Sequence, residues 1–420
     1  MKKILSVLCA LMMSLSPFTA APSFFAADVS AAAASDTAGD QKIEKELRKG
    51  LTAFDKRIKL IRTVQNYDES KADEFYKDIQ DTFAGLMTDK EFFYVEDSLT
   101  LSGWVFNNTM HINVDVSYIT DKSYLNSYRN KFDKALKNTV SGVDKKWTDL
   151  QKAAYLHDTL ILNTSYLKDD ASRYTATPYA ALANGKALCV GYARAYSILL
   201  SEVGIKSMLV DTGDHEWNLV KIGGSWYHVD CTYDDSYIDN VQNPYTVFHT
   251  YFLKSDAAMS DHGTFSPAGM ACSTTYDNFG WKDPISPFAF YGNGIIYNDG
   301  SSVKVYNSST KKTTKLFPVT DKWEIHWMDP SPYYEDVFDE HWLSIEGNHS
   351  YLAPLKDKIY YNKAHAVYRY DPKTGKIQTI YTNKESDDMI TELYFRNGKL
   401  YASFMDRKGK EKARTIKISA

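Results

Sequence analysis

Between residues 189 and 230 the chain carries a thiol, an imidazole and a carboxylate, the three groups that can activate a sulfur nucleophile. Cys189 opens a run whose apolar residues recur at helical spacing up to Gly204, so we expect the thiol in the first turn of a helix. There the free N–H groups and the positive end of the helix dipole favour a thiolate. Gly191, two residues on, leaves room for another backbone or a substrate.

The imidazole and the carboxylate are predicted to meet on a β-hairpin. Two strand-like segments, residues 216–222 and 225–232, are joined by two glycines, which are typical of a two-residue hairpin turn. Counting outward from this turn places His215 and Asp230 on one face as diagonal neighbours, within reach of a side-chain hydrogen bond. The register therefore predicts a His–Asp pair to which the helix presents Cys189.

Several other side chains compete for roles beside these three groups. His228 shares the face of the His–Asp pair but lies nearer the turn, so we interpret it as a flanking residue. Trp217 and Trp226 on the same face are candidates for shielding an acyl intermediate, and packing of the hairpin is the alternative. Tyr179, ten residues before the thiol, is a candidate for the acyl site or the oxyanion hole, and a buried core tyrosine explains it equally well.

The segment 185–235 resembles the transglutaminase-like superfamily, whose cores are papain-like. The resemblance implies an α+β core in which a nucleophile helix packs on an antiparallel sheet. It also implies Cys189 as nucleophile, His215 as base and Asp230 as the carboxylate that orients the base, in agreement with the register. The family often has proline after the aspartate, and Cys231 in its place predicts a slightly different local bend. The matching positions are Gly185 to Ala193, His215, Trp217, Asn218, Val220, Gly224, Trp226, Tyr227, Val229, Asp230, Thr232 and Asp235.

The beginning of the chain predicts export. Lys2 and Lys3 precede an apolar run from Ile4 to about Ala20 and an alanine-rich stretch, which is the pattern of a secretory signal peptide. We expect residues 1–34 to hold this signal and a small-residue linker, with no integral membrane segment after its removal. The predicted location is secreted, extracellular or associated with the cell surface.

Composition and spacing exclude some classes of function. The formal net charge of −4, without clustered Lys or Arg, argues against a nucleic-acid partner. Three cysteines remain after the leader, so at least one thiol is free. The acidic residues Asp234, Asp235 and Asp239 match no calcium loop, and His249 and His262 have no partner at zinc spacing. We interpret the acidic stretch as a solvated loop and expect no metal and no cofactor.

Residues 35–120 are expected to form an α+β lead-in. Apolar residues at helical spacing predict an amphipathic helix from Ile43 to about Val64, and a second helix has its apolar stripe at residues 75–86. Between residues 110 and 118 the period changes to two, which predicts strands. An integral accessory layer and a removable pro-segment are the two interpretations, and we favour the first.

The catalytic core is expected at residues 121–283. Thr148 and Gln151 form a capping box that opens a helix. His157 lies on this helix, and we interpret it as a packing or hydrogen-bonding residue.

Residues 284–420 are expected to form a β-rich module with blade-like repeats. Residues 295–306 resemble residues 358–370, and a third run begins at Gly398. The module has room for only about three blades of ~40 to 45 residues, fewer than the usual minimum of four for closure. We therefore predict an antiparallel meander or a partial propeller.

Two classes of function follow from these observations. In the first, the protein is a secreted thiol-dependent acyl transferase or hydrolase, or a cysteine peptidase of the same core, acting on carboxamides of peptides or proteins through a Cys189 thioester. Shielding by Trp217 and Trp226 mildly favours transfer over hydrolysis. In the second, the core is a catalytically idle scaffold, and the β-rich module binds a cell-wall or extracellular polymer.

Overall fold

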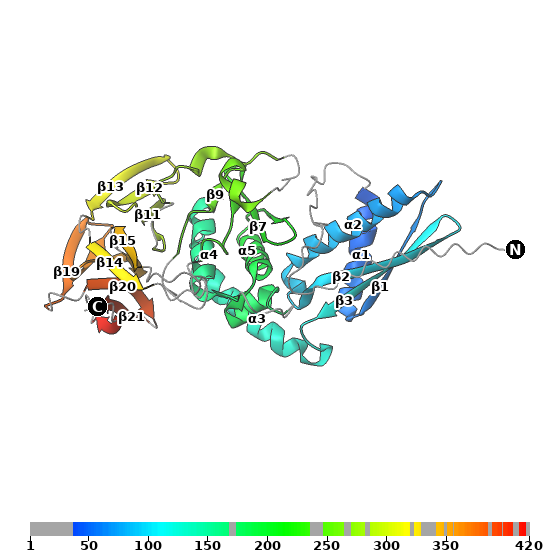
Figure 1. Ribbon diagram of the computed structural model, residues 1–420, viewed down its shortest axis with the longest axis horizontal. Helices are drawn as coiled ribbons and strands as arrows, with labels where there is room; N and C mark the ends of the chain where they lie inside the picture. Colours follow the sequence, from blue (N-terminus) through cyan, green and yellow to red (C-terminus); the bar gives the residue numbers. More distant parts are fainter. Residues whose placement is uncertain are drawn as a thin grey trace. The chain divides into compact units, whose positions relative to one another are not determined.

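The chain is a mixed α+β protein with antiparallel sheets, in the computed structural model shown in Figure 1. Two compact units divide the chain: unit 1 comprises residues 1–141, 166–232 and 254–274, and unit 2 comprises residues 142–165, 233–253 and 275–420. The predicted signal peptide and Asp239 lie outside the described residues. The structure describes residues 37–167, 174–235, 247–263, 270–281, 286–319, 323–328, 342–347, 351–355, 357–384, 389–396, 398–405 and 411–416.

The N-terminal part of unit 1 packs two helices on one face of a three-stranded sheet. The helices are α1 (Thr37–Ala53) and α2 (Glu69–Met87), and the strands lie in the order β1 (Arg57–Thr63), β3 (Thr109–Tyr118), β2 (Val95–Phe106). The two-residue period predicted for β3 is confirmed, because every second residue of this strand is buried. The buried residues are Met110, Ile112, Val114 and Val116.

The first helix is shorter than the sequence pattern predicts. It ends at Ala53, where Phe54 adopts a φ of 65° and the N–H of Asp55 donates to the carbonyl of Gly50. The apolar residues beyond this turn lie on β1, where Ile58 is buried and Ile61 is 51% exposed. The prediction of a helix to Val64 is wrong, because the pairing of β1 with β3 overrides a local spacing that also fits a helix.

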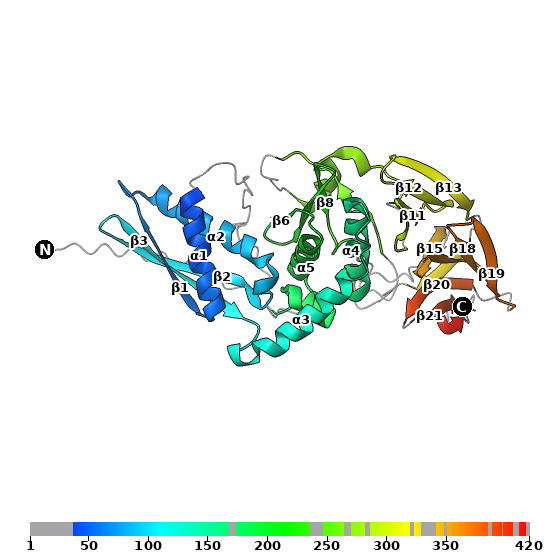
Figure 2. The same cartoon turned by 180° about the vertical axis from the view of Figure 1, so that it is seen from behind.

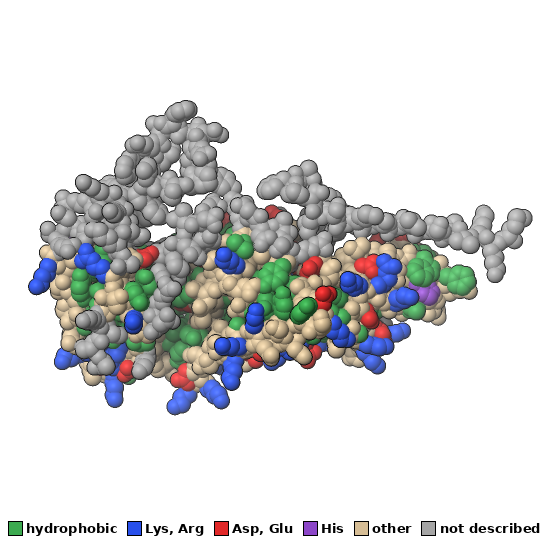
Figure 3. Space-filling view, turned by 90° about the horizontal axis from the view of Figure 1, so that it is seen from below, with side chains coloured by type: hydrophobic (Ala, Val, Ile, Leu, Met, Phe, Trp, Pro, Cys, Tyr) green, Lys and Arg blue, Asp and Glu red, His purple; other side chains and the backbone are tan. Residues whose placement is uncertain are grey.

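The other face of this sheet exposes apolar side chains. Ile61 on β1 and Trp104 on β2 both pair with His111 on β3, and the Trp104 and His111 rings stack with centroids 5.1 Å apart. Phe106 is 64% exposed. Figure 3 shows such a group of hydrophobic side chains beside a histidine.

The rest of unit 1 is built around a helix on an antiparallel sheet. Helix α5 (Cys189–Glu202) packs on strands that follow one another as β6 (Ser207–Asp211), β7 (Glu216–Ile222) and β8 (Ser225–Val229) (Figure 2). The predicted hairpin register is confirmed, with Ile222 paired to Ser225 and Leu219 to His228. Asn218 points to the helix, since its Nδ2 donates to the carbonyl of Ala193 at 2.9 Å.

Two further helices and several short elements complete the mixed α and β part. Helix α3 (Leu125–Val140) belongs to unit 1 and α4 (Asp149–Asn163) to unit 2. The predicted capping box of Thr148 and Gln151 is confirmed at the start of α4. The short elements are η1 (Lys90–Phe92), η2 (Lys122–Tyr124), β4 (Ser165–Tyr166), η3 (Ala180–Asn184), β5 (Lys186–Ala187), β9 (Phe252–Lys254), η4 (Ala257–His262) and η5 (Thr274–Tyr276).

In the described part of its C-terminal region, unit 2 forms four antiparallel sheets whose strands follow chain order. The similar segments 295–306 and 358–370 fall in the first and third sheets, and each of these sheets has a register shift at the same place, after Val303 and after Val367. The length of the module predicted about three blades, and the described residues form four sheets. The sheets are β10 (Ala289–Tyr291), β11 (Gly294–Asn298), β12 (Ser302–Asn307) and β13 (Lys312–Pro318); β14 (Trp323–Met328) and β15 (Trp342–Gly347); β16 (Leu352–Leu355), β17 (Lys358–Lys363), β18 (Ala366–Asp371) and β19 (Lys376–Thr382); β20 (Met389–Arg396), β21 (Lys399–Met405) and β22 (Glu411–Ile416).

None of the helices in the described ranges combines the length and the apolar character needed to cross a bilayer.

Candidate catalytic site

Cys189 is the first residue of α5, as the sequence predicts. The N-cap position is taken by Leu188, whose side chain has no acceptor and makes no capping hydrogen bond. Two residues on, a Cβ on Gly191 would lie 2.8 Å from the carbonyl oxygen of Thr175, so only glycine lets this backbone approach the helix. The half-buried thiol thus lies at a helix N-terminus that carries no side-chain cap.

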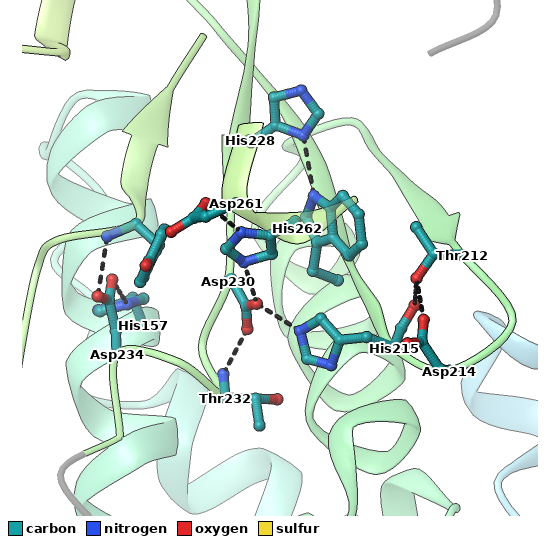
Figure 4. A network of polar contacts seen from close by, with 12 residues as sticks. His157, Thr212, Asp214, His215, His228, Asp230, Thr232, Asp234, Asp261 and His262 are labelled. Carbon is teal, nitrogen blue, oxygen red and sulfur yellow. Dashed lines mark hydrogen bonds and ion pairs between the residues drawn. The ribbon is translucent and has the colours of Figure 1, made fainter. Parts of the chain in front are cut away.

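His215 connects the thiol to the carboxylate of Asp230. The imidazole is hydrogen-bonded to the side chain of Cys189. Its Nε2 lies 2.5 Å from Asp230 Oδ2, the contact drawn in Figure 4. Burial opposes the charged imidazole, but the hydrogen bonds to Asp230 and Cys189 outweigh it and raise the pKa of His215 to about 10. The structure therefore brings the His–Asp pair predicted from the hairpin register together with the cysteine predicted at the helix start, and His215 favours its protonated form.

Asp230 has more partners than the sequence predicts. Its side chain is 1% exposed, and Oδ1 accepts the backbone N–H of Thr232 at 2.8 Å. Oδ2 also lies 3.0 Å from Nε2 of His262, a residue that sequence reasoning left without a role. His262 follows Asp230 by 32 residues and ends the short helix η4, so no periodic pattern links the two.

Trp217 packs on the ring of His215. The two rings are stacked with centroids 5.6 Å apart, and the indole is 1% exposed. Its Nε1–H donates to Nδ1 of His228 at 2.9 Å, so His228 must carry its proton on Nε2, which donates to Asp256 at 2.9 Å. Burial lowers the pKa of His228, in keeping with this neutral tautomer. His228 is thus a neutral residue that supports Trp217.

The other two acyl-site candidates lie elsewhere. Trp226 is paired with Lys221 near the hairpin turn, and four residues of extended strand, about 13 Å, separate it from Asp230. Tyr179 is 2% exposed and packs between Phe93 and Tyr128, with ring centroids 5.9 Å and 4.9 Å away. Core packing accounts for the burial of Tyr179.

A buried ion pair joins α5 to β7, the strand that follows His215. Arg194 on α5 hydrogen-bonds to Asp97 on β2, and its Nε lies 3.5 Å from Oε1 of Glu216, the residue after His215. Arg194 is 3% exposed and Glu216 5% exposed. Burial raises the pKa of Glu216 well above its usual range, although Arg194 opposes the shift.

Unit 2 contains a second cluster of buried histidines and carboxylates. Nδ1 of His157 lies 2.9 Å from Asp158 and its Nε2 lies 3.2 Å from Asp234, while Nε2 of His249 lies 3.0 Å from Asp158. His157 is a hydrogen-bonding residue, as predicted. The interpretation of Asp234 and Asp235 as part of a solvated loop is wrong, because they are 0% and 7% exposed. Their histidine and backbone partners come from distant segments, which the local sequence does not reveal.

Among the described residues, three groups of histidine, cysteine and aspartate side chains have possible metal-ligand atoms within 4.8 Å of one another. Within each group a histidine nitrogen faces a carboxylate oxygen at hydrogen-bonding distance, so we assign no metal ligand. The groups are His157, Asp158 and His249; His215, Asp230 and His262; and His228, Asp256 and Cys272.

The comparison with protein families agrees with this geometry. Residues 134–231 match the model described as the transglutaminase-like superfamily, and the match includes Cys189, His215 and Asp230. Residues 134–231 belong to the transglutaminase-like superfamily. The resemblance expected from residues 185–235 is thereby confirmed. Among curated proteins, none matches the sequence.

Solved structures provide only distant likenesses to this chain. A "TGase" is 12% identical, with 44% of this chain and 52% of that chain covered and a TM-score of 0.23. A "Putative Cysteine Protease from Cytophaga hutchinsonii" is 12% identical, with 32% and 62% covered and a TM-score of 0.20. The extracellular domain of a "putative one component system" from B. thetaiotaomicron is 11% identical, with 48% and 27% covered and a TM-score of 0.22. The chain therefore spans less than two thirds of the length of each of these three structures, and no inference about fold or function is based on TM-scores of 0.20 to 0.23.

Proposed function

We propose that this protein is a secreted, thiol-dependent acyl transferase or hydrolase that acts on carboxamide groups of peptides or proteins. The observation that carries the proposal is the continuous contact from Cys189 through His215 to Asp230, at the N-terminus of α5. A scaffold without activity has no chemical need for all three groups in contact. The proposal includes the division of the chain into three regions after the signal peptide. These are the lead-in at residues 35–120, the catalytic core at residues 121–283 and the β-rich module at residues 284–420.

In the proposed reaction, the Cys189 thiolate attacks the carbonyl carbon of the carboxamide. The C–N bond breaks as the His215 imidazolium gives its proton to the departing amine or ammonia, and a thioester remains on Cys189. An amine or water then attacks the thioester carbonyl carbon, and His215 accepts the proton of the attacking group. The C–S bond breaks, and Cys189 leaves as the thiolate beside the His215 imidazolium. An amine gives transfer, and water gives deamidation or proteolysis.

Site-resolved alkylation tests whether Cys189 is the nucleophile. With limiting iodoacetamide at pH 7, we expect Cys189 to react about tenfold or more faster than the buried Cys231 and Cys272, because thiolate character sets the rate. His215→Ala should remove most of this advantage, and His228→Ala is the matched control. Mass spectrometry resolves the three thiols. Equal reactivity of the three cysteines, or no effect of His215→Ala, would contradict the proposal and favour the idle scaffold that binds a polymer.

A second assay separates the possible acceptors. A glutamine-rich peptide is incubated with a biotinylated primary amine, and the products are analysed for incorporated biotin, released ammonia and cleaved peptide. Incorporated biotin identifies transfer, ammonia without biotin identifies deamidation, and shorter peptides identify a peptidase. Cys189→Ala should abolish each product. Product formation that survives this substitution would show that Cys189 is not the nucleophile.

A further inference from the structure

His262 is placed behind the predicted triad, on the far side of its carboxylate. Oδ2 of Asp230 faces both His215 and His262, and Oδ1 accepts the N–H of Thr232. Figure 4 shows the two imidazoles converging on Asp230 from different segments. The carboxylate is thereby held on both oxygens, and His262 supplies the contact that comes from neither hairpin strand.

The second ring nitrogen of His262 also faces a carboxylate. Nδ1 lies 2.8 Å from Oδ1 of Asp261, whose side chain is 56% exposed, whereas His262 itself is 0% exposed at the side chain. An ionised carboxylate is an acceptor of hydrogen bonds, so each ring nitrogen of His262 faces an acceptor oxygen. A contact chain therefore runs from the thiol of Cys189 through His215, Asp230 and His262 to a carboxylate at the surface.

His228 shows that this arrangement is not shared by every histidine nearby. It is equally buried, but one ring nitrogen accepts from the indole of Trp217, so the ring is neutral. The titratable groups around His262 are Asp230, Asp261, His215 and His228. Of the two buried histidines, only His262 donates to the carboxylate that orients His215.

We propose that His262 is a positioning residue that fixes the Asp230 carboxylate and, through it, the imidazole of His215. This inference rests on the proposed function of the site. The contact of His262 with Asp230 is the route by which it acts on His215. Its Nε2–H holds Oδ2 in the direction of His215, and it provides a hydrogen-bond partner for a carboxylate that is buried between two imidazoles.

The test measures the alkylation rate of Cys189 at pH 7 in two variants of His262. His262→Leu keeps the volume but removes the donor, and we expect a rate about tenfold lower, because a hydrogen bond to a buried charge is lost. His262→Gln keeps an N–H donor and should restore the rate to within about threefold of the wild type. His249→Leu is the matched control for the loss of a buried imidazole that faces a carboxylate outside the predicted triad, and its rate should stay within about threefold.

A double-mutant cycle tests the contact without using Cys189. His262→Leu, Asp230→Asn and the double variant are compared by their melting temperatures, and the combined loss should be smaller than the sum of the single losses. Additive losses would overturn the inference, as would a wild-type alkylation rate in His262→Leu or an equal loss in His262→Leu and His262→Gln. If His215→Ala itself leaves the wild-type rate unchanged, the proposed function fails and the positioning role fails with it.

Discussion

At the scale of single residues, the hydrogen-bond partners of each histidine in the site decide whether it is charged. His215 faces Asp230 and the thiol, and its pKa rises to about 10 because these partners outweigh the effect of burial. His228 faces an indole N–H, and burial lowers its pKa. Two histidines on one face of the same hairpin thus have opposite preferences for the proton. The hairpin register places both residues, and their hydrogen-bond partners decide their charge.

This difference predicts opposite pH dependences of stability for substitutions at His215 and His228. The raised pKa of His215 stabilises the fold in full below about pH 6.5, and this contribution is lost as the pH rises toward 10. His215→Gln should therefore cost the most near pH 6, on the order of a few kcal/mol, and progressively less up to pH 10. Urea unfolding at several pH values measures the free energy of unfolding.

His228→Gln is the matched control for that experiment. The lowered pKa of His228 gives a contribution that is present above about pH 6.5 and lost as the pH falls, so its cost should grow with pH. Parallel pH profiles for the two variants would contradict the assignment of a charged His215 and a neutral His228.

At the scale of secondary-structure elements, α5 and β7 must stay in register for Cys189 to reach His215. Two buried contacts on the helix hold them. Asn218 of β7 donates to the carbonyl of Ala193, and Arg194 lies between Asp97 and Glu216. Glu216 is adjacent in sequence to the base, so the ion pair also fixes the start of the strand.

Removing one side of this ion pair should destabilise the protein. Arg194→Met leaves Glu216 buried beside no cation, and we expect a loss of about 3 to 5 kcal/mol in the free energy of unfolding. The double variant Arg194→Met/Glu216→Gln removes both charges and should recover a substantial part of the loss. Chemical denaturation measures both. An equal loss in the single and double variants would show that packing, and not the uncompensated charge, sets the cost.

At the scale of the whole molecule, the chain forms two compact units with cores of their own. In unit 2, neighbouring sheets share apolar clusters, and one of them joins β13 to the sheet that contains β17 and β18. Phe317 lies in this cluster, with ring centroids 4.6 Å from Tyr361 and 5.0 Å from Tyr370. The aromatic residues of these sheets therefore serve the core as well as the surface.

Truncation of Phe317 tests whether the two units unfold separately. We expect two thermal transitions, and Phe317→Ala should lower one of them, with a loss of about 3 to 5 kcal/mol. The alkylation rate of Cys189 below that transition should stay at the wild-type value. Phe106→Ala, at a phenylalanine that is 64% exposed, is the control and should change neither transition. Calorimetry measures both, and a single transition that moves as a whole would contradict independent units.

The sequence by itself determined the triad candidates, because their geometry depends on local rules. A turn of two glycines sets the pairing of β7 with β8, and the alternation of strand side chains then places His215 beside Asp230. A periodic apolar run likewise starts α5 at Cys189. These features need no knowledge of distant segments.

Only the tertiary structure decided which residues surround the triad and where local patterns give way. His262 reaches Asp230 from another segment, and Asp234 is buried because His157 on α4 faces it. Ile58 lies on a strand because β3 pairs with it, although its spacing also fits a helix. The physical reason is the same in each case. A buried polar group or a strand edge must form hydrogen bonds with another part of the chain, and that part is remote in the sequence.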